Sequence, residues 1–64
     1  MKLNIKINSN NEAFSEFSWQ AETARLLGLI AYEITVQTKD RNLIFDLNGN
    51  KVGHWNVEIN EGKL

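Results

Sequence analysis

Three oxygen-bearing side chains stand at alternate positions in the second half of this 64-residue chain, and their spacing could bind a cation. Asp46, Asn48 and Asn50 fill the first, third and fifth places of an EF-hand calcium loop. The sixth place of such a loop needs glycine for its sharp turn, and the twelfth needs a bidentate glutamate. Lys51 and Val57 stand there instead, so the run does not predict a calcium site.

Catalytic chemistry has few other candidates. His54 is the sole histidine and could act as a general base, but no serine or cysteine is placed as its activated nucleophile. Asp40 and Asp46 lie on either side of an expected strand, and nothing in the sequence would divide them into a general acid and a general base. The absence of cysteine excludes disulfides and Cys/His zinc sites. We therefore expect a protein that is not an enzyme and has no cofactor or metal.

Aromatic rings offer a different chemistry, the stacking of nucleotide bases. The candidate rings are Phe17, Trp19, Tyr32 and Trp55, and the candidate phosphate contacts are Arg25, Arg41 and Lys51. A domain of this size has little room for a pocket that buries a ligand, so a nucleotide site would have to form between subunits. The formal charge of −1, without a basic stripe, argues against general nucleic-acid binding.

The length of the chain allows one small domain, residues 1–64. A chain this short buries only about 60% of its unfolded surface, and a partner chain is the remaining means of adding stability. The longest apolar run, residues 26–32, is too short to span a bilayer. The first residues alternate too regularly for the core of a signal peptide, so we expect a cytoplasmic protein without membrane association.

The first half of the chain predicts a strand and a helix. Apolar residues alternate with polar ones over residues 1–7, which is typical of a half-buried strand. The aromatic stretch of residues 13–19 fits no single period, and we interpret it as a loop that lays Phe14, Phe17 and Trp19 over the end of the core. A helix should follow over residues 18–38, with Ser18 as its cap. Its expected core arc comprises Thr23, Ala24, Leu26, Leu27, Ile30, Ala31 and Ile34.

The second half predicts a hairpin. Asn48 and Gly49 accept positive φ and lie between two apolar runs, residues 43–47 and 52–59. A bulge at Gly53 and His54 would place Val52 on the same face as Trp55. Without a bulge, Ile44 and Val52 would lie on the outer face, and the sequence leaves both arrangements open. The long last strand is best used in the middle of the sheet. The expected fold is α+β, in the order β-α-β-β, with one helix packed on one face of a three-stranded sheet.

The helix also predicts an interaction surface opposite its expected core arc. A solvent face normally carries lysine and glutamate, whereas this one groups Leu, Tyr and Val around an Arg, and Gly28 would let another backbone approach. Tyr and Arg are types enriched at the centres of interfaces. Two alternatives remain. Residues 14–19 could fold over these side chains, or their exposure could be the ordinary scatter of apolar residues on a protein surface. The candidate partner-binding residues are Arg25, Gly28, Leu29, Tyr32 and Val36.

Two segments together resemble a family of small proteins encoded by phages and prophages. The segments are Glu22-Thr23-Ala24-Arg25-Leu26-Leu27 on the helix and Asp46-Leu47-Asn48-Gly49-Asn50-Lys51-Val52-Gly53 in the hairpin. The chain departs from the family pattern at Gly28 and Leu29, where polar residues would be expected. The resemblance carries no activity, but it implies a class of gene whose short products commonly inhibit host enzymes or defence systems, anti-CRISPR proteins among them.

The expected function is therefore the binding and inhibition of a host protein, such as a defence effector, in the cytoplasm of a bacterial host. The alternative is a homo-oligomer that sequesters a nucleotide or signalling ligand between its subunits. In both cases the expected partner is another protein chain, either a host target or a second copy of this one.

Overall fold

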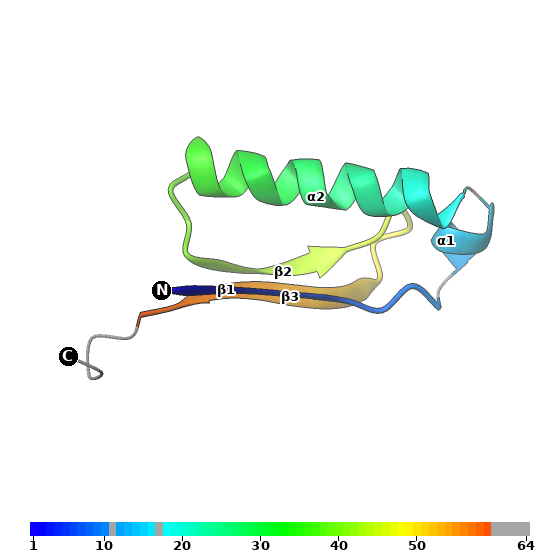
Figure 1. The fold of residues 1–64 in the computed structure, drawn as a ribbon. Helices are drawn as coiled ribbons and strands as arrows, with labels where there is room; N and C mark the ends of the chain where they lie inside the picture. The colour runs from blue at the N-terminus through cyan, green and yellow to red at the C-terminus, as the bar shows by residue number, and fades with distance from the viewer. Residues whose placement is uncertain (11, 17, 60–64) are drawn as a thin grey trace.

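A single long helix lies along one face of a three-stranded antiparallel sheet (Figure 1). The computed structural model describes residues 1–10, 12–16 and 18–59. The elements follow in the order β1 (Lys2–Ile7), α1 (Glu12–Glu16), α2 (Trp19–Thr35), β2 (Arg41–Phe45) and β3 (Lys51–Glu58). This arrangement confirms the α+β class and the β-α-β-β order, with the short helix α1 added between β1 and α2.

The strand order is β1-β3-β2, which confirms that the longest strand lies in the middle. The pairing of β3 with β2 shifts by one residue after Ile44. Ile44 is opposite Gly53, but the next residue, Phe45, is opposite Lys51, so Val52 has no partner on β2. Val52 is therefore the extra residue of a bulge. Val52, Trp55 and Ile44 are all buried, so the bulged arrangement is the correct alternative, although the bulge lies slightly earlier than Gly53 and His54.

The hairpin between β2 and β3 forms as the sequence predicts. Gly49 has a φ of +82°, a conformation that glycine adopts without steric cost. Its N–H donates to the carbonyl of Asp46 at 3.0 Å, and the Asp46 N–H donates to the carbonyl of Asn50 at 2.9 Å. These bonds close the turn and set the start of β3.

Helix α2 begins where the sequence predicts and ends earlier. The Ser18 hydroxyl accepts a hydrogen bond from the Ala21 N–H at 3.1 Å, which satisfies one of the unpaired donors of the first turn. At the other end, Thr38 has a φ of +50°, and the Lys39 N–H donates to the Glu33 carbonyl at 3.0 Å. The chain therefore leaves the helix after Thr35 rather than at Thr38.

The core contains only part of the expected helical arc. Leu26 and Ile30 are buried as expected, but Leu27, Ile34, Ala24 and Ala31 are exposed. The predicted arc was wrong because it was centred on apolar residues, whereas two glutamates belong to the face that meets the sheet. The buried apolar residues are Ala13, Phe14, Leu26, Ile30, Ile44, Val52 and Trp55, with Ile7 and Val57 packed against them.

The interpretation of residues 13–19 as a loop was wrong for its first half. Glu12–Glu16 forms α1, whose Ala13 and Phe14 side chains are buried in the core. Phe14 therefore covers the end of the core from a helix. Trp19 is the exposed first residue of α2, and Phe17 lies outside the described residues.

Candidate functional site

Glu33 ties helix α2 to two strands of the sheet. Its side chain is buried, and one carboxylate oxygen accepts from the indole Nε1–H of Trp55 at 2.9 Å. The other oxygen accepts from the Asn42 amide at 2.6 Å. Trp55 is on β3 and Asn42 is on β2, so a single carboxylate connects three elements. A buried indole N–H needs such a partner, because an unsatisfied donor in the core is costly.

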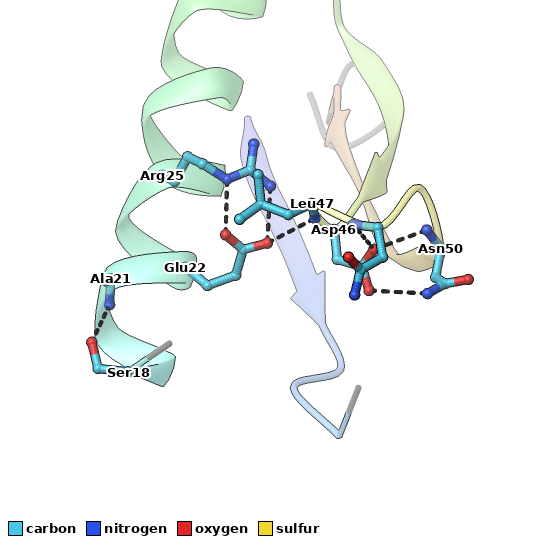
Figure 2. A network of polar contacts seen from close by, with 8 residues as sticks. Ser18, Ala21, Glu22, Arg25, Asp46, Leu47 and Asn50 are labelled. Atoms are coloured by element: carbon cyan, nitrogen blue, oxygen red, sulfur yellow. Dashed lines mark hydrogen bonds and ion pairs between the residues drawn. The ribbon is translucent and has the colours of Figure 1, made fainter. Parts of the chain in front are cut away.

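Glu22 makes a second connection, between the first turn of α2 and the hairpin (Figure 2). Its two oxygens accept from the Nε–H and an Nη–H of Arg25 at 2.8 and 2.9 Å, and one of them also accepts from the Leu47 N–H at 3.1 Å. The Arg25 guanidinium lowers the pKa of Glu22, against the opposing effect of burial. The same bonds raise the pKa of Arg25. Glu22 is therefore held ionised as a structural group.

These two glutamates decide which side of α2 faces solvent. Three residues between Trp19 and Thr35 are charged: Glu22, Arg25 and Glu33. Both glutamates point inward, and the one cation is paired with Glu22. The exposed surface of α2 thus has no unpaired charge, although a solvent-facing helix surface is normally rich in charged residues. The large apolar side chains that α2 and its C-cap expose are Trp19, Leu27, Leu29, Tyr32, Ile34 and Val36.

The predicted partner-binding residues all lie at the surface. Leu29, Tyr32 and Val36 expose 44%, 49% and 62% of their accessible area, so the described part of the aromatic segment does not cover them. No other part of the described chain comes within 4 Å of a Cβ built on Gly28, which leaves that position open to a partner. Arg25 differs from the other four, because its guanidinium is engaged by Glu22. We define the outer face of α2 as Gly28, Leu29, Tyr32 and Val36.

The residues considered for metal binding serve the hairpin. One Asp46 carboxylate oxygen accepts from the N–H groups of Asn48 and Asn50, each at 2.9 Å. Its other oxygen lies 3.5 Å from the Asn50 amide nitrogen. Within residues 1–10, 12–16 and 18–59, no group of three or more His, Cys, Asp or Glu side chains could hold a metal ion. One oxygen of the Asp46 carboxylate thus accepts from two backbone donors of the turn, and the other faces the Asn50 amide.

The residues considered for catalysis and stacking are dispersed. His54 is exposed on β3, opposite Lys6 of β1 and Leu43 of β2. Trp55 is buried, so its ring is not accessible to a base, while Trp19 and Tyr32 remain exposed on α2. Arg41 pairs with Asp40 at 3.4 Å on the surface.

Sequence reasoning missed Glu22 and Glu33 as buried groups. Two signals were available: the two acids share one helical stripe with Leu26 and Ile30, and the Trp55 indole required an acceptor. The expectation that acids face solvent outweighed both signals.

No described helix combines the length and apolar character needed to cross a membrane. Comparison of the chain with family models, curated proteins and solved structures gives no match.

Proposed function

We propose that this chain is a non-enzymatic protein that binds another protein through the outer face of α2. The resemblance to phage-encoded proteins favours a target in a bacterial host, and the class of function that it suggests is an inhibitor of a host defence effector. The observation that supports the proposal is the distribution of side chains on α2, which buries both glutamates and exposes Leu29, Tyr32 and, at its C-cap, Val36.

The exposed apolar side chains of α2 add little to the stability of the fold unless another chain covers them. An exposed Leu, Tyr and Val gain little in an isolated monomer, and grouped apolar exposure on soluble proteins marks interaction sites. Tyr32 supplies an aromatic ring with a polar hydroxyl, a combination enriched at interface centres. Leu29 and Val36 lie on the same side of the helix, one turn before and one turn after Tyr32. Three adjacent anchors of this kind suit a groove or flat apolar patch on a target.

The test compares two double variants that differ in which flank of α2 they change. Leu29→Gln with Tyr32→Gln alters the outer face, and Leu27→Gln with Ile34→Gln alters the opposite flank. All four residues are exposed, and glutamine favours helix, so both variants should retain the native circular dichroism spectrum. Affinity capture from a host lysate identifies a target with the unmodified chain, and binding is then measured with the purified target.

We expect the outer-face variant to weaken binding by at least tenfold, because each lost anchor is worth about 1–2 kcal/mol or more. The opposite-flank variant should bind within about threefold of the unmodified chain, a difference of roughly 0.6 kcal/mol. Equal binding by both variants would contradict the proposal. Inhibition of the target, measured with the same variants, should follow the same order as binding.

A further inference from the structure

Strand β1 presents an unpaired edge. It pairs with β3 alone, and no other described strand lies along its second side. The Asn8 N–H donates to the Val52 carbonyl at 2.7 Å, which fixes the even-numbered residues as those whose backbone groups face β3. The N–H and C=O groups of Leu3, Ile5 and Ile7 consequently point to the open edge. Such a row of donors and acceptors is a template for another strand.

The other edge of the sheet is blocked at its centre. The backbone groups of Asp40, Asn42 and Ile44 face β3, because the Val57 N–H donates to the Asp40 carbonyl at 2.9 Å. Leu43 therefore points its N–H away from β3, and that N–H donates to the Asn42 side-chain oxygen at 2.9 Å. Asn42 is itself held by Glu33. This intramolecular bond occupies the central donor of β2, so β1 is the edge available for pairing.

The helix-facing side of β1 is apolar and only partly covered. Ile5 is opposite the buried Trp55 and Leu3 is opposite Val57, so both lie on the face that carries α2. Yet Ile5 exposes 39% and Leu3 exposes 50% of their accessible area. An adjacent strand with apolar residues at matching positions would cover both.

We propose that β1 pairs antiparallel with β1 of a second copy of this chain, with the two Ile5 residues directly opposite each other. Two symmetric registers pair five residues of β1, centred on Asn4 or on Ile5. Centring on Asn4 places Lys2 opposite Lys6 twice, and like charges directly opposite are destabilising. Centring on Ile5 places Lys6 opposite Asn4 and Leu3 opposite Ile7, which avoids the repulsion and matches apolar with apolar.

The resulting dimer has one continuous six-stranded antiparallel sheet. Its two-fold axis runs perpendicular to the sheet at Ile5, so both copies of α2 lie on the same face. The outer face of α2 takes no part in the strand pairing, and the dimer does not depend on the proposed function. It explains how so short a chain without disulfides adds to its stability.

Single-cysteine variants test the register, since the natural chain has no cysteine. In the proposed dimer, Asn4 of one copy and Lys6 of the other form a non-hydrogen-bonded pair with a Cα separation of about 4.5 Å, within disulfide range. A mixture of Asn4→Cys and Lys6→Cys should oxidise to the mixed disulfide, and each variant alone should remain largely uncrosslinked. Crosslinking of Asn4→Cys with itself would overturn the register. Crosslinking of the β2-edge control Leu43→Cys would overturn the choice of edge.

Substitutions that change charge test the dimer without a disulfide crosslink. Sedimentation equilibrium should show a monomer–dimer equilibrium for the natural chain, and a monomer at every concentration would overturn the proposal. Asn4→Lys should weaken the dimer by roughly two- to thirtyfold, because it creates two like-charge pairs with Lys6. Adding Lys6→Glu to that variant should restore association. Asn48→Lys, at the hairpin tip, makes the same charge change away from β1 and should leave the dimer unchanged. A failure of Asn4→Lys to weaken it, or of Lys6→Glu to restore it, would also overturn the proposal.

Discussion

Removal of the Glu33 carboxylate should be among the most damaging single changes to this fold. In Glu33→Ala, the indole N–H of Trp55 loses its acceptor within the core, and the Asn42 amide loses its own. The two losses differ, because Trp55 is fully buried while Asn42 is half-buried and can turn toward water. The variant therefore isolates the contribution of one side chain that connects α2, β2 and β3.

The magnitude follows from these contacts. An unsatisfied buried donor costs about 1–3 kcal/mol, and a hydrogen bond to a charged acceptor contributes about 1.5–3 kcal/mol. Relief of the buried negative charge offsets part of that cost. We expect the free energy of unfolding to fall by about 2–4 kcal/mol. A domain of this size has a total of roughly 3–10 kcal/mol, so the loss would be a large fraction of its stability.

Urea unfolding followed by far-ultraviolet circular dichroism measures the change. Glu33→Gln is the informative companion, because its amide oxygen can accept one of the two bonds while its NH2 group opposes the other donor. It should lose about 1–2 kcal/mol, between the natural chain and Glu33→Ala. Glu12→Ala removes an exposed acid from α1 and should stay within about 0.5 kcal/mol of the natural chain.

Two results would refute this reasoning. An unfolding free energy for Glu33→Ala within about 0.5 kcal/mol of the natural chain would mean that the bonds do not hold the helix. A Glu33→Gln variant more stable than the natural chain would mean that the buried charge costs more than its hydrogen bonds return.

Three further predictions use the same unfolding measurement. Gly53→Ala should destabilise the domain by about 2–3 kcal/mol, because the added Cβ would collide with the backbone carbonyl of Lys6; stability equal to the natural chain would contradict the close approach of β1. Leu26 is buried, so Leu26→Ala should lower the free energy of unfolding by about 2–5 kcal/mol. The Leu27 side chain is 45% exposed, so Leu27→Ala should lower it by under about 1 kcal/mol; the reverse order would contradict the orientation of α2. The pKa of Glu22 is lowered on folding, so its stabilisation is fully present above its ordinary value of 4.5 and is lost as pH falls through the folded pKa. The gap in stability between the natural chain and Glu22→Gln should therefore shrink on acidification from about pH 7 to about pH 3, and a constant gap would count against the ion pair.

The sheet was predictable because its signals are local. Alternation over residues 1–7 and the Asn48-Gly49 turn each specify a backbone conformation within a few residues. The length of the last strand then favoured the middle position that β3 occupies. The sequence did not decide whether β3 has a bulge, because the bulge at Val52 depends on the pairing with β2 and on the close approach of β1 at Gly53.

The orientation of α2 could not be read from apolar periodicity, because polar contacts decide it. A helical wheel places the apolar majority inward, yet the helix turns so that Glu33 reaches Trp55 and Glu22 reaches Leu47. Those contacts join residues that are 22 and 25 positions apart in the chain. The candidate partner-binding residues were nevertheless placed correctly at the surface, with Arg25 reassigned from a free anchor to the partner of Glu22.

The buried glutamates link the stability of the fold to the surface that α2 presents. If Leu27 and Ile34 faced the sheet in place of Glu22 and Glu33, α2 would gain apolar burial and expose acids, as a solvent-facing helix surface usually does. The chain instead satisfies each buried carboxylate with at least two hydrogen-bond donors and leaves Leu29, Tyr32 and Val36 outside. The buried acids keep α2 attached to the sheet by directional bonds, while Leu29, Tyr32 and Val36 remain exposed for a partner. An interaction surface on so small a domain is therefore compatible with folding only while Glu22 and Glu33 keep their donors.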